Sequence, residues 1–133
     1  MFGVNDNSYQ AAGQFAGIEK LVACFYQNMD SLHAAKIIRD MHASDLTLSK
    51  KKLTYFLSGW LGGPKLYTEH FGGINIPQAH CHLPISTPES NAWLLCMDNA
   101  IDKQPYIEKF NAYLKAQFRI PAERIHTACQ KPV

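Results

Sequence analysis

The stretch from Ile18 to Leu32 constrains the fold more than any other, because its large side chains repeat at helical spacing without a break. This stripe consists of Ile18, Leu21, Val22, Phe25, Tyr26, Met29 and Leu32. Positions spaced i, i+3, i+4 and i+7 share one face of a helix and must be covered by other elements. No strand-length alternation of polar and apolar residues occurs elsewhere, so the sequence predicts an all-α fold.

Further helices are predicted from caps and from glycine and proline stops. Ser8 is a suitable N-cap for a short first helix, which should break around Gly17, and another short helix is expected over 34–41. Longer helices are predicted over 45–60, 76–83, 87–101 and 105–129, and a Gly-Gly-Pro stop at 62–64 follows the first of these. Pro121 should kink the last helix or split it near Ile120.

Length and composition restrict the class of protein. We expect 133 residues to form one domain spanning 1–133, and an apolar content of 47% argues against disorder. The net charge of +2 argues against nucleic acid or a membrane surface as partner. Neither a leader nor an apolar stretch of about 20 residues is present, so we expect a cytoplasmic protein. The scattered cysteines, Cys24, Cys81, Cys96 and Cys129, are interpreted as free thiols.

The stretch from Ile76 to Trp93 contains the histidine that the pattern directs inward. His80 shares an apolar stripe with Ile76 and Leu83, whereas His82 lies about 200° further around the helix. An imidazole on such a stripe is either a core histidine bonded to a carbonyl or a ligand for a metal-bearing cofactor. Periodicity alone favours the core histidine. The helical spacing predicts that Trp93 lies in the core, and its indole N–H needs a hydrogen-bond acceptor if the side chain is buried.

Other polar residues have two interpretations each. Tyr26 on the buried stripe requires a hydrogen-bond partner, either a backbone carbonyl or a ligand. His42 lies in a turn and, by itself, is expected to be exposed. Ser49 leaves space on an otherwise apolar stripe, and Lys52 beside it is either solvated or leans over an anion. An inward histidine, tyrosine and tryptophan on different helices are together the inventory of a haem pocket.

Several motifs, in unbroken order over about residues 8–103, resemble those of the group II truncated haemoglobins. They are Phe25-Tyr26, Phe56-Leu57 leading to Trp60-Leu61-Gly62-Gly63-Pro64, Leu66-Tyr67-Thr68-Glu69, His80 followed by Pro84-Ile85-Ser86, and Ala92-Trp93-Leu94-x-Cys96-Met97. The resemblance implies a truncated globin fold, a two-over-two helical sandwich around haem b. Non-covalent binding agrees with the absence of a Cys-x-x-Cys-His motif.

The resemblance also implies roles for individual residues. His80 matches the proximal iron ligand. The residues that match distal positions around the bound ligand are Tyr26, Trp93 and His42, and those that match haem contacts are Ser49, Lys52, Leu53, Phe56 and Tyr67, with Lys52 at a propionate. The sequence departs from the family pattern in a longer connection between Tyr26 and His42, in Ala79 replacing an arginine, and in Pro121.

The implied ligands are O2, NO, CO or peroxide. Several hydrogen-bond donors around bound O2 would slow its release, which suits redox detoxification, either nitric oxide dioxygenation or peroxidase-like turnover, better than oxygen delivery. Turnover requires an unidentified reductase, and we expect a monomer or weak dimer. One alternative is an oxygen or gas sensor that acts through a partner. Another is a zinc-stabilised helical module, which the lack of paired Cys and His motifs disfavours.

Overall fold

The computed structural model describes residues 2–72 and 87–129, with the backbone alone described for 123–129. Its elements, in chain order, are α1 (Asn7–Ala11), α2 (Gln14–Ser31), the 3₁₀ turn η1 (His33–Ala35), α3 (Lys36–Arg39), α4 (Thr47–Trp60), α5 (Leu66–Phe71), α7 (Thr87–Asp102) and α8 (Glu108–Cys129). No strand occurs in these ranges. The prediction of an all-α fold is confirmed.

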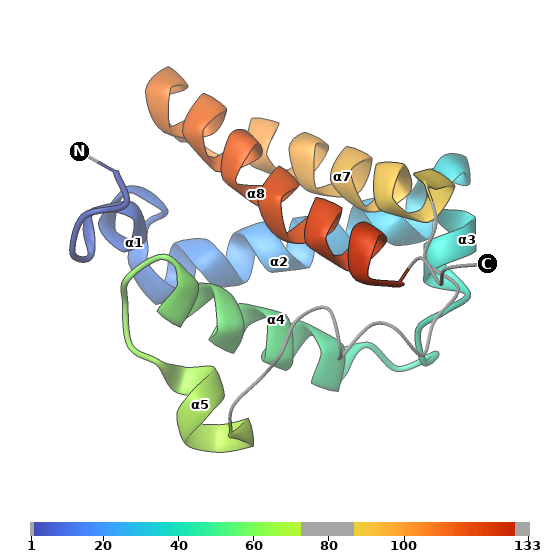
Figure 1. Cartoon of the computed structure of the whole chain (residues 1–133), viewed down its shortest axis with the longest axis horizontal. Coiled ribbons are helices and arrows are strands. Elements are labelled where there is room, and N and C mark those ends of the chain that lie inside the picture. Colours follow the sequence, from blue (N-terminus) through green and yellow to red (C-terminus); the bar gives the residue numbers. More distant parts are fainter. Residues whose placement is uncertain (1, 73–86, 130–133) are drawn as a thin grey trace.

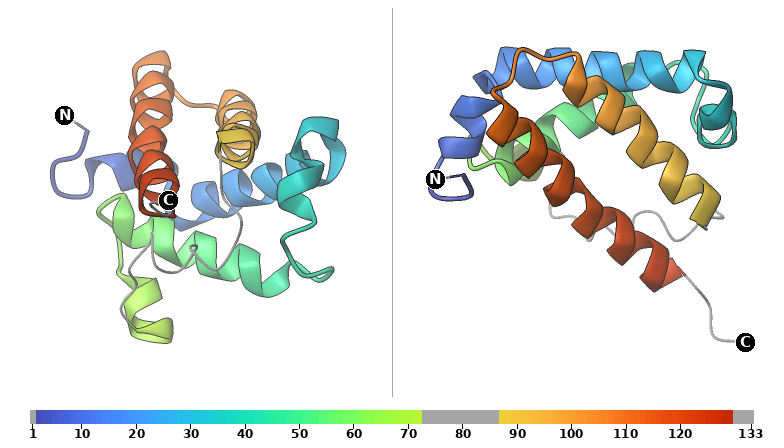
Figure 2. Two further views of the ribbon diagram at one scale, coloured as in Figure 1. Left: turned by 45° about the vertical axis from the view of Figure 1, so that its right-hand side comes forward. Right: turned by 90° about the horizontal axis from the view of Figure 1, so that it is seen from above.

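The four long helices form two layers. Helices α7 and α8 lie side by side over α2 and α4 (Figures 1 and 2). Helix α2 packs against both α4 and α7, so it joins the layers, and α5 packs against α4 at the edge. This is the two-over-two arrangement that the resemblance implies.

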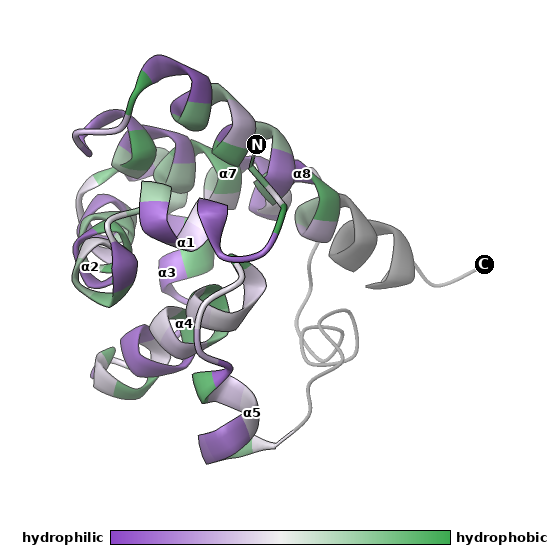
Figure 3. Ribbon diagram, turned by 90° about the vertical axis from the view of Figure 1, so that its left-hand side faces the viewer, coloured by the Kyte–Doolittle hydropathy of each residue, from purple (hydrophilic) through white to green (hydrophobic). Residues whose placement is uncertain are grey.

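The stripe on α2 is buried as its spacing predicts, except that Leu32 is half-buried at the C-cap. It shares one core cluster with apolar residues of α7 and α8, which include Met97, Ile101, Phe110 and Leu114. Hydrophobic and hydrophilic residues alternate along α2 and α4, as expected for helices with one covered face (Figure 3).

The buried Asn28 links α2 to α7. Its amide nitrogen donates a hydrogen bond to the Cys96 carbonyl at 2.9 Å, and Lys103 Nζ donates to its amide oxygen at 3.2 Å. Cys96 is itself buried, and burial raises the pKa of its thiol to about 11. Both Cys24 and Cys96 are free thiols, as predicted.

The first helix break is at Gly13, not at Gly17, so that prediction was wrong. Gly13 has φ +90°, a conformation that glycine adopts without steric strain, and α2 then runs through Gly17. A Cβ at Gly17 would lie 1.9 Å from the Ala12 carbonyl oxygen. Gly17 therefore permits the close approach of α1, which helical periodicity cannot show.

Ser8 is not the N-cap of α1. It lies inside the helix and is buried, and its hydroxyl oxygen accepts a hydrogen bond from the Gly3 amide at 2.9 Å. The serine hydroxyl thus fixes the preceding segment, which folds back on the helix, instead of satisfying the helix's own amides.

The predicted Gly-Gly-Pro stop after α4 is confirmed. Helix α4 ends at Trp60, and Gly62 adopts φ +92°. The Ser58 hydroxyl donates to the Pro64 carbonyl at 2.7 Å, which ties the last turn of the helix to the loop.

Helix α8 continues through Pro121, so of the two predicted alternatives, a kink or a split near Ile120, the split does not occur. Proline removes one amide donor and crowds the carbonyl four residues earlier, but it does not forbid a helix that tertiary packing holds together. Phe118, one turn earlier, is fully buried and supplies such packing.

Candidate functional site

Helix α4 has two inward faces of different character. One face packs against α2 and is closed, with Thr54 (5% exposed), Leu57 (1%) and Ser58 (0%). The other carries Ser49, Leu53, Phe56 and Trp60, spaced i, i+4, i+7 and i+11, and all four are half-buried. The closed face therefore carries two small hydroxyl residues beside Leu57, whereas three of the four residues on the open stripe are large and apolar. The open stripe is suited to contact an apolar group outside the helix pair.

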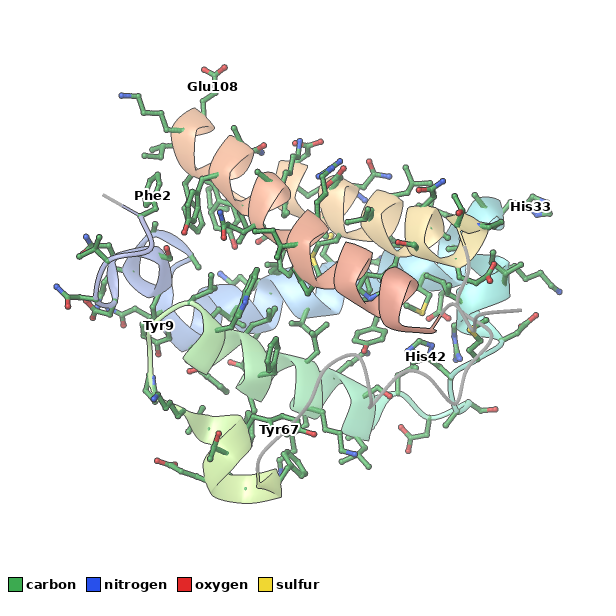
Figure 4. All side chains as sticks on the ribbon, viewed as in Figure 1. Phe2, Tyr9, His33, His42, Tyr67 and Glu108 are labelled. Carbon is green, nitrogen blue, oxygen red and sulfur yellow. The ribbon has the colours of Figure 1, made fainter. Side chains whose placement is uncertain are left out.

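Aromatic rings continue the open stripe across neighbouring helices. The ring centroids lie 6.4 Å apart for Tyr67–Phe56, 6.4 Å for Phe56–Trp60, 4.9 Å for Trp60–Phe118, 5.6 Å for Phe118–Trp93 and 5.1 Å for Trp93–Phe25. We refer to these six residues as the aromatic wall. Five elements contribute to the aromatic wall, namely α2, α4, α5, α7 and α8. Tyr67, on α5, lies beside α4 (Figure 4).

Sequence reasoning gave Phe25, Trp60 and Phe118 no site role. Trp60 follows Phe56 on the same stripe, and this spacing was a usable signal. Phe118 joins Trp60 to Trp93 only through the packing of α8, which no local pattern reveals.

Tyr26 lies at one end of this wall with its hydroxyl weakly engaged. The side chain is 5% exposed, and its hydroxyl donates to the Ser49 carbonyl at 3.5 Å, against a usual O–H···O distance of about 2.7–2.8 Å. Burial raises the pKa of Tyr26 to about 12, because the phenolate would be desolvated. At neutral pH the residue is therefore a phenol whose proton is free to reach a better acceptor.

His42 is half-buried and faces Tyr26, whereas its turn position predicted an exposed side chain. The two ring centroids are 5.8 Å apart at an interplanar angle of 79°. His42 Nδ1 lies 2.8 Å from the Ile38 carbonyl oxygen, and a carbonyl only accepts. Nδ1 therefore carries the proton, and Nε2 of the neutral ring has a lone pair. His42 lies where the chain passes from α3 to α4 (Figure 4).

Trp93 lies near Tyr26 through a shared neighbour. Phe25 packs against both residues, with centroid distances of 5.0 Å to Tyr26 and 5.1 Å to Trp93. The structure thus brings three sequence-predicted distal residues, Tyr26, His42 and Trp93, to one end of the wall.

Lys52 lies at the other end, toward α5. Its Nζ is 5.6 Å from the centroid of the Phe71 ring, and Phe71 packs against Tyr67 at 5.1 Å. The side chain is exposed, so its ammonium can turn toward an anion at this edge.

His80 and residues 73–86 lie outside the described residues. Within the described ranges, no three His, Cys, Asp or Glu residues converge so as to hold a metal ion. The assignment of His80 as iron ligand remains a prediction from the sequence.

These features fit a haem. The half-buried open stripe of α4 suits the porphyrin, the weakly held phenol suits a diatomic ligand, and a lysine at the edge suits a propionate.

The model of the bacterial-like globin family matches residues 7–122. The chain belongs to this family. The group 2 truncated hemoglobin YjbI of Bacillus subtilis is 36% identical to this globin over 94 residues, which are 71% of its chain and 68% of the relative. Solved structures support the same family assignment.

The group II 2-on-2 hemoglobin of Agrobacterium tumefaciens superposes with a TM-score of 0.85 at 33% identity, covering 89% of the globin and 92% of that chain. A truncated oxygen-avid haemoglobin from Bacillus subtilis superposes with a TM-score of 0.79 at 32% identity, covering 89% and 97%.

The predicted resemblance to group II truncated haemoglobins is therefore confirmed. As a member of this family, the globin binds haem and small gaseous ligands. In the ranges that the structure describes, no helix combines the length and apolar character needed to cross a membrane.

Proposed function

We propose that this globin retains dioxygen in its distal pocket and uses it to oxidise nitric oxide to nitrate. The observation that carries the proposal is the buried, neutral Tyr26 phenol with its weakly held proton. A bound haem b, with His80 as the proximal ligand, would supply the iron that binds and activates the diatomic ligand. Ser49, Leu53, Phe56 and Tyr67 would enclose the porphyrin, and Lys52 would pair with a propionate.

Tyr26 acts as the main distal donor. A bound haem would place partial negative charge on dioxygen, and a hydrogen bond from Tyr26 to such a charged acceptor would contribute about 1.5–3 kcal/mol. Since about 1.4 kcal/mol changes a rate tenfold, this one bond slows oxygen release by about 10- to 100-fold. The indole N–H of Trp93, on the other side of Phe25, adds a second donor.

In the neutral tautomer that the Ile38 carbonyl selects, His42 accepts through Nε2 instead of donating. Because Nδ1–H is bound to the Ile38 carbonyl, Nε2 offers a lone pair toward the pocket. It would thereby orient the Tyr26 hydroxyl, or bind the iron when no other ligand is present. Only the imidazolium would donate through Nε2.

Rapid mixing of the oxygenated protein with nitric oxide tests the proposal. We expect one nitrate per protein and conversion to the ferric form at the rate of mixing. A nitrate yield far below one, with free oxygen released, would contradict it.

Peroxide-dependent turnover is a second candidate, favoured by the orientation of His42. Its Nε2 lone pair can take a proton from hydrogen peroxide and return it to the leaving oxygen atom, while Tyr26 stabilises the charge that develops there. Replacement of His42 by Phe should slow peroxide-dependent oxidation of guaiacol by about 10²-fold or more, the usual contribution of a general base. An unchanged rate would eliminate this role.

Nitric oxide oxidation leaves the protein ferric, so its turnover requires an electron donor that restores the ferrous form, whereas peroxide-dependent turnover starts and ends ferric and takes its electrons from the oxidised substrate. We propose a separate reductase for this role, and a single globin domain, monomeric or weakly dimeric, in the cytoplasm.

A further inference from the structure

We propose that electrons enter this globin through the outer face of α4 and α5, and that this face docks an acidic electron-transfer protein. We refer to it as the cationic face and define it by Lys50, Lys51, Lys52, Tyr55, His70 and Phe71. The inference rests on the proposed redox function, because only a protein that must be returned from the ferric to the ferrous form needs an electron donor.

Positively charged side chains far outnumber negatively charged ones on this face. Residues 47–72 contain four lysines and a single acid, Glu69, and all five side chains are exposed. Asp45, before α4, has a lowered pKa, chiefly because its carboxylate accepts hydrogen bonds from Thr47 and to a lesser extent because Lys50 lies near it. The ion pairs recorded within the described residues join Arg39 to Asp30, Lys115 to Asp102 and Arg119 to Asp98, all outside α4 and α5. The lysines of the cationic face thus remain available to a partner.

Two of the ammonium groups are held in place by aromatic rings. Lys51 Nζ lies 5.5 Å from the centroid of Tyr55, and Lys52 Nζ lies 5.6 Å from that of Phe71. Tyr55 packs against His70 at 5.1 Å and against Phe71 at 6.1 Å, so the rings form one layer under the charges. A cation–π contact restricts a lysine that would otherwise move freely, and less entropy is then lost on docking.

The same layer continues into the proposed haem site. Phe71 packs against Tyr67 at 5.1 Å, and Tyr67 packs against Phe56 at 6.4 Å. Tyr67 and Phe56 are the proposed porphyrin contacts on this side, and Lys52 is the proposed propionate contact. If Tyr67 and Phe56 hold a haem as proposed, the rings of Phe71, Tyr67 and Phe56 would connect a donor seated on the cationic face to that haem.

These charges fit a cluster of carboxylates on a protein surface. A net charge of +2 is too small for a membrane surface or for nucleic acid, and a patch on two short helical segments matches a small protein partner. Complementary charge raises the encounter rate at low ionic strength and orients the partner. In the transfer step, a reduced flavin gives up one electron and becomes a semiquinone, the ferric globin becomes ferrous, and no covalent bond forms.

Stopped-flow reduction of the ferric holoprotein under CO tests the proposal, with fully reduced flavodoxin as the acidic probe. Lys51→Glu is compared with Lys109→Glu, which changes the net charge equally. Lys109 adjoins Glu108 at the start of α8, on the side of the molecule opposite α5 (Figure 4). Reduced riboflavin, a small donor with no protein surface to dock, monitors damage to the haem site itself.

We expect reduction by flavodoxin to slow about tenfold between 10 and 300 mM salt, because screening weakens steering. At low salt, Lys51→Glu should be about five- to tenfold slower than the wild type and Lys109→Glu within twofold, with riboflavin rates equal. Equal slowing by the two variants, or salt-independent rates, would overturn the proposal. If Lys51→Glu loads less haem by its Soret band, Lys50→Glu is used in its place.

Failure of the docking proposal is distinguishable from failure of the proposed function. Reduction is measured without oxygen or nitric oxide, whereas the nitrate yield of the oxygenated protein requires no donor protein.

Discussion

The two inward faces of α4 differ in how fully the protein's own residues cover them. On the closed face, Thr54 donates to the Lys50 carbonyl and Ser58 to the Pro64 carbonyl, both at 2.7 Å, and Leu57 fills the space against α2. On the open stripe, Phe56 and Trp60 are only half-buried. The closed face of α4 thus stabilises the polypeptide itself, whereas the open stripe is the face that we propose to contact the cofactor.

The largest effect should come from exchanging a large side chain on each face. Leu57→Ala should lower the free energy of unfolding by about 2–5 kcal/mol, with or without haem, because it leaves a cavity in the closed core. Phe56→Ala should cost the apoprotein less and should instead speed haem loss. Urea denaturation of both forms and haem transfer to apomyoglobin measure the two quantities. Equal apoprotein destabilisation would remove the distinction between the faces.

A smaller effect concerns the pH dependence of stability at Tyr26. Burial raises its folded pKa to about 12 from 10.0, so the contribution of the buried phenol is complete below pH 10 and is lost as pH rises toward 12. Over that window one such group lowers the free energy of unfolding by about 1.4 kcal/mol per pH unit. Tyr26→Phe should flatten the dependence by about this amount in urea titrations at pH 9–11.5.

The control for that measurement is Tyr55→Phe, which removes a half-buried phenol from the outer side of α4. If both variants flatten the curve equally, the effect does not come from the burial of Tyr26.

The smallest effect compares two serines on the same helix. Ser58→Ala removes the donor to the Pro64 carbonyl and should cost about 1 kcal/mol of stability. Ser49→Ala, on the open stripe, should change stability by less than about 0.5 kcal/mol, as expected outside the closed core. Thermal unfolding of the apoproteins measures the difference, and the reverse order would show that the faces have been assigned wrongly.

Much of this division could be predicted from the sequence. The stripe on α2, the stop after α4 and the start of α7 at Thr87 follow from local spacing and breakers, and the structure agrees. The burial of Thr54 and Ser58 could not be predicted, because an amphipathic pattern assigns polar residues to solvent. Such residues turn inward only when the backbone supplies acceptors, as the Lys50 and Pro64 carbonyls do here.

The candidate site shows the same limit. Tyr26 was predictable because it interrupts a strong stripe, whereas His42 lies in a turn without periodicity. Its direction is set by the Ile38 carbonyl, which fixes the ring against Tyr26. Spacing within one segment predicts what faces inward, but contacts between segments decide which inward residues meet.

Oxygen dissociation by stopped flow tests the central claim most directly, namely that Tyr26 and Trp93 hold the ligand in the pocket. The ferrous oxygenated wild type, Tyr26→Phe, Trp93→Phe and the Tyr55→Phe control are mixed with excess CO. We expect Tyr26→Phe to release oxygen about 10- to 100-fold faster, Trp93→Phe to follow in the same direction and the control to match the wild type. Dissociation rates in both distal variants equal to that of the wild type would contradict the account.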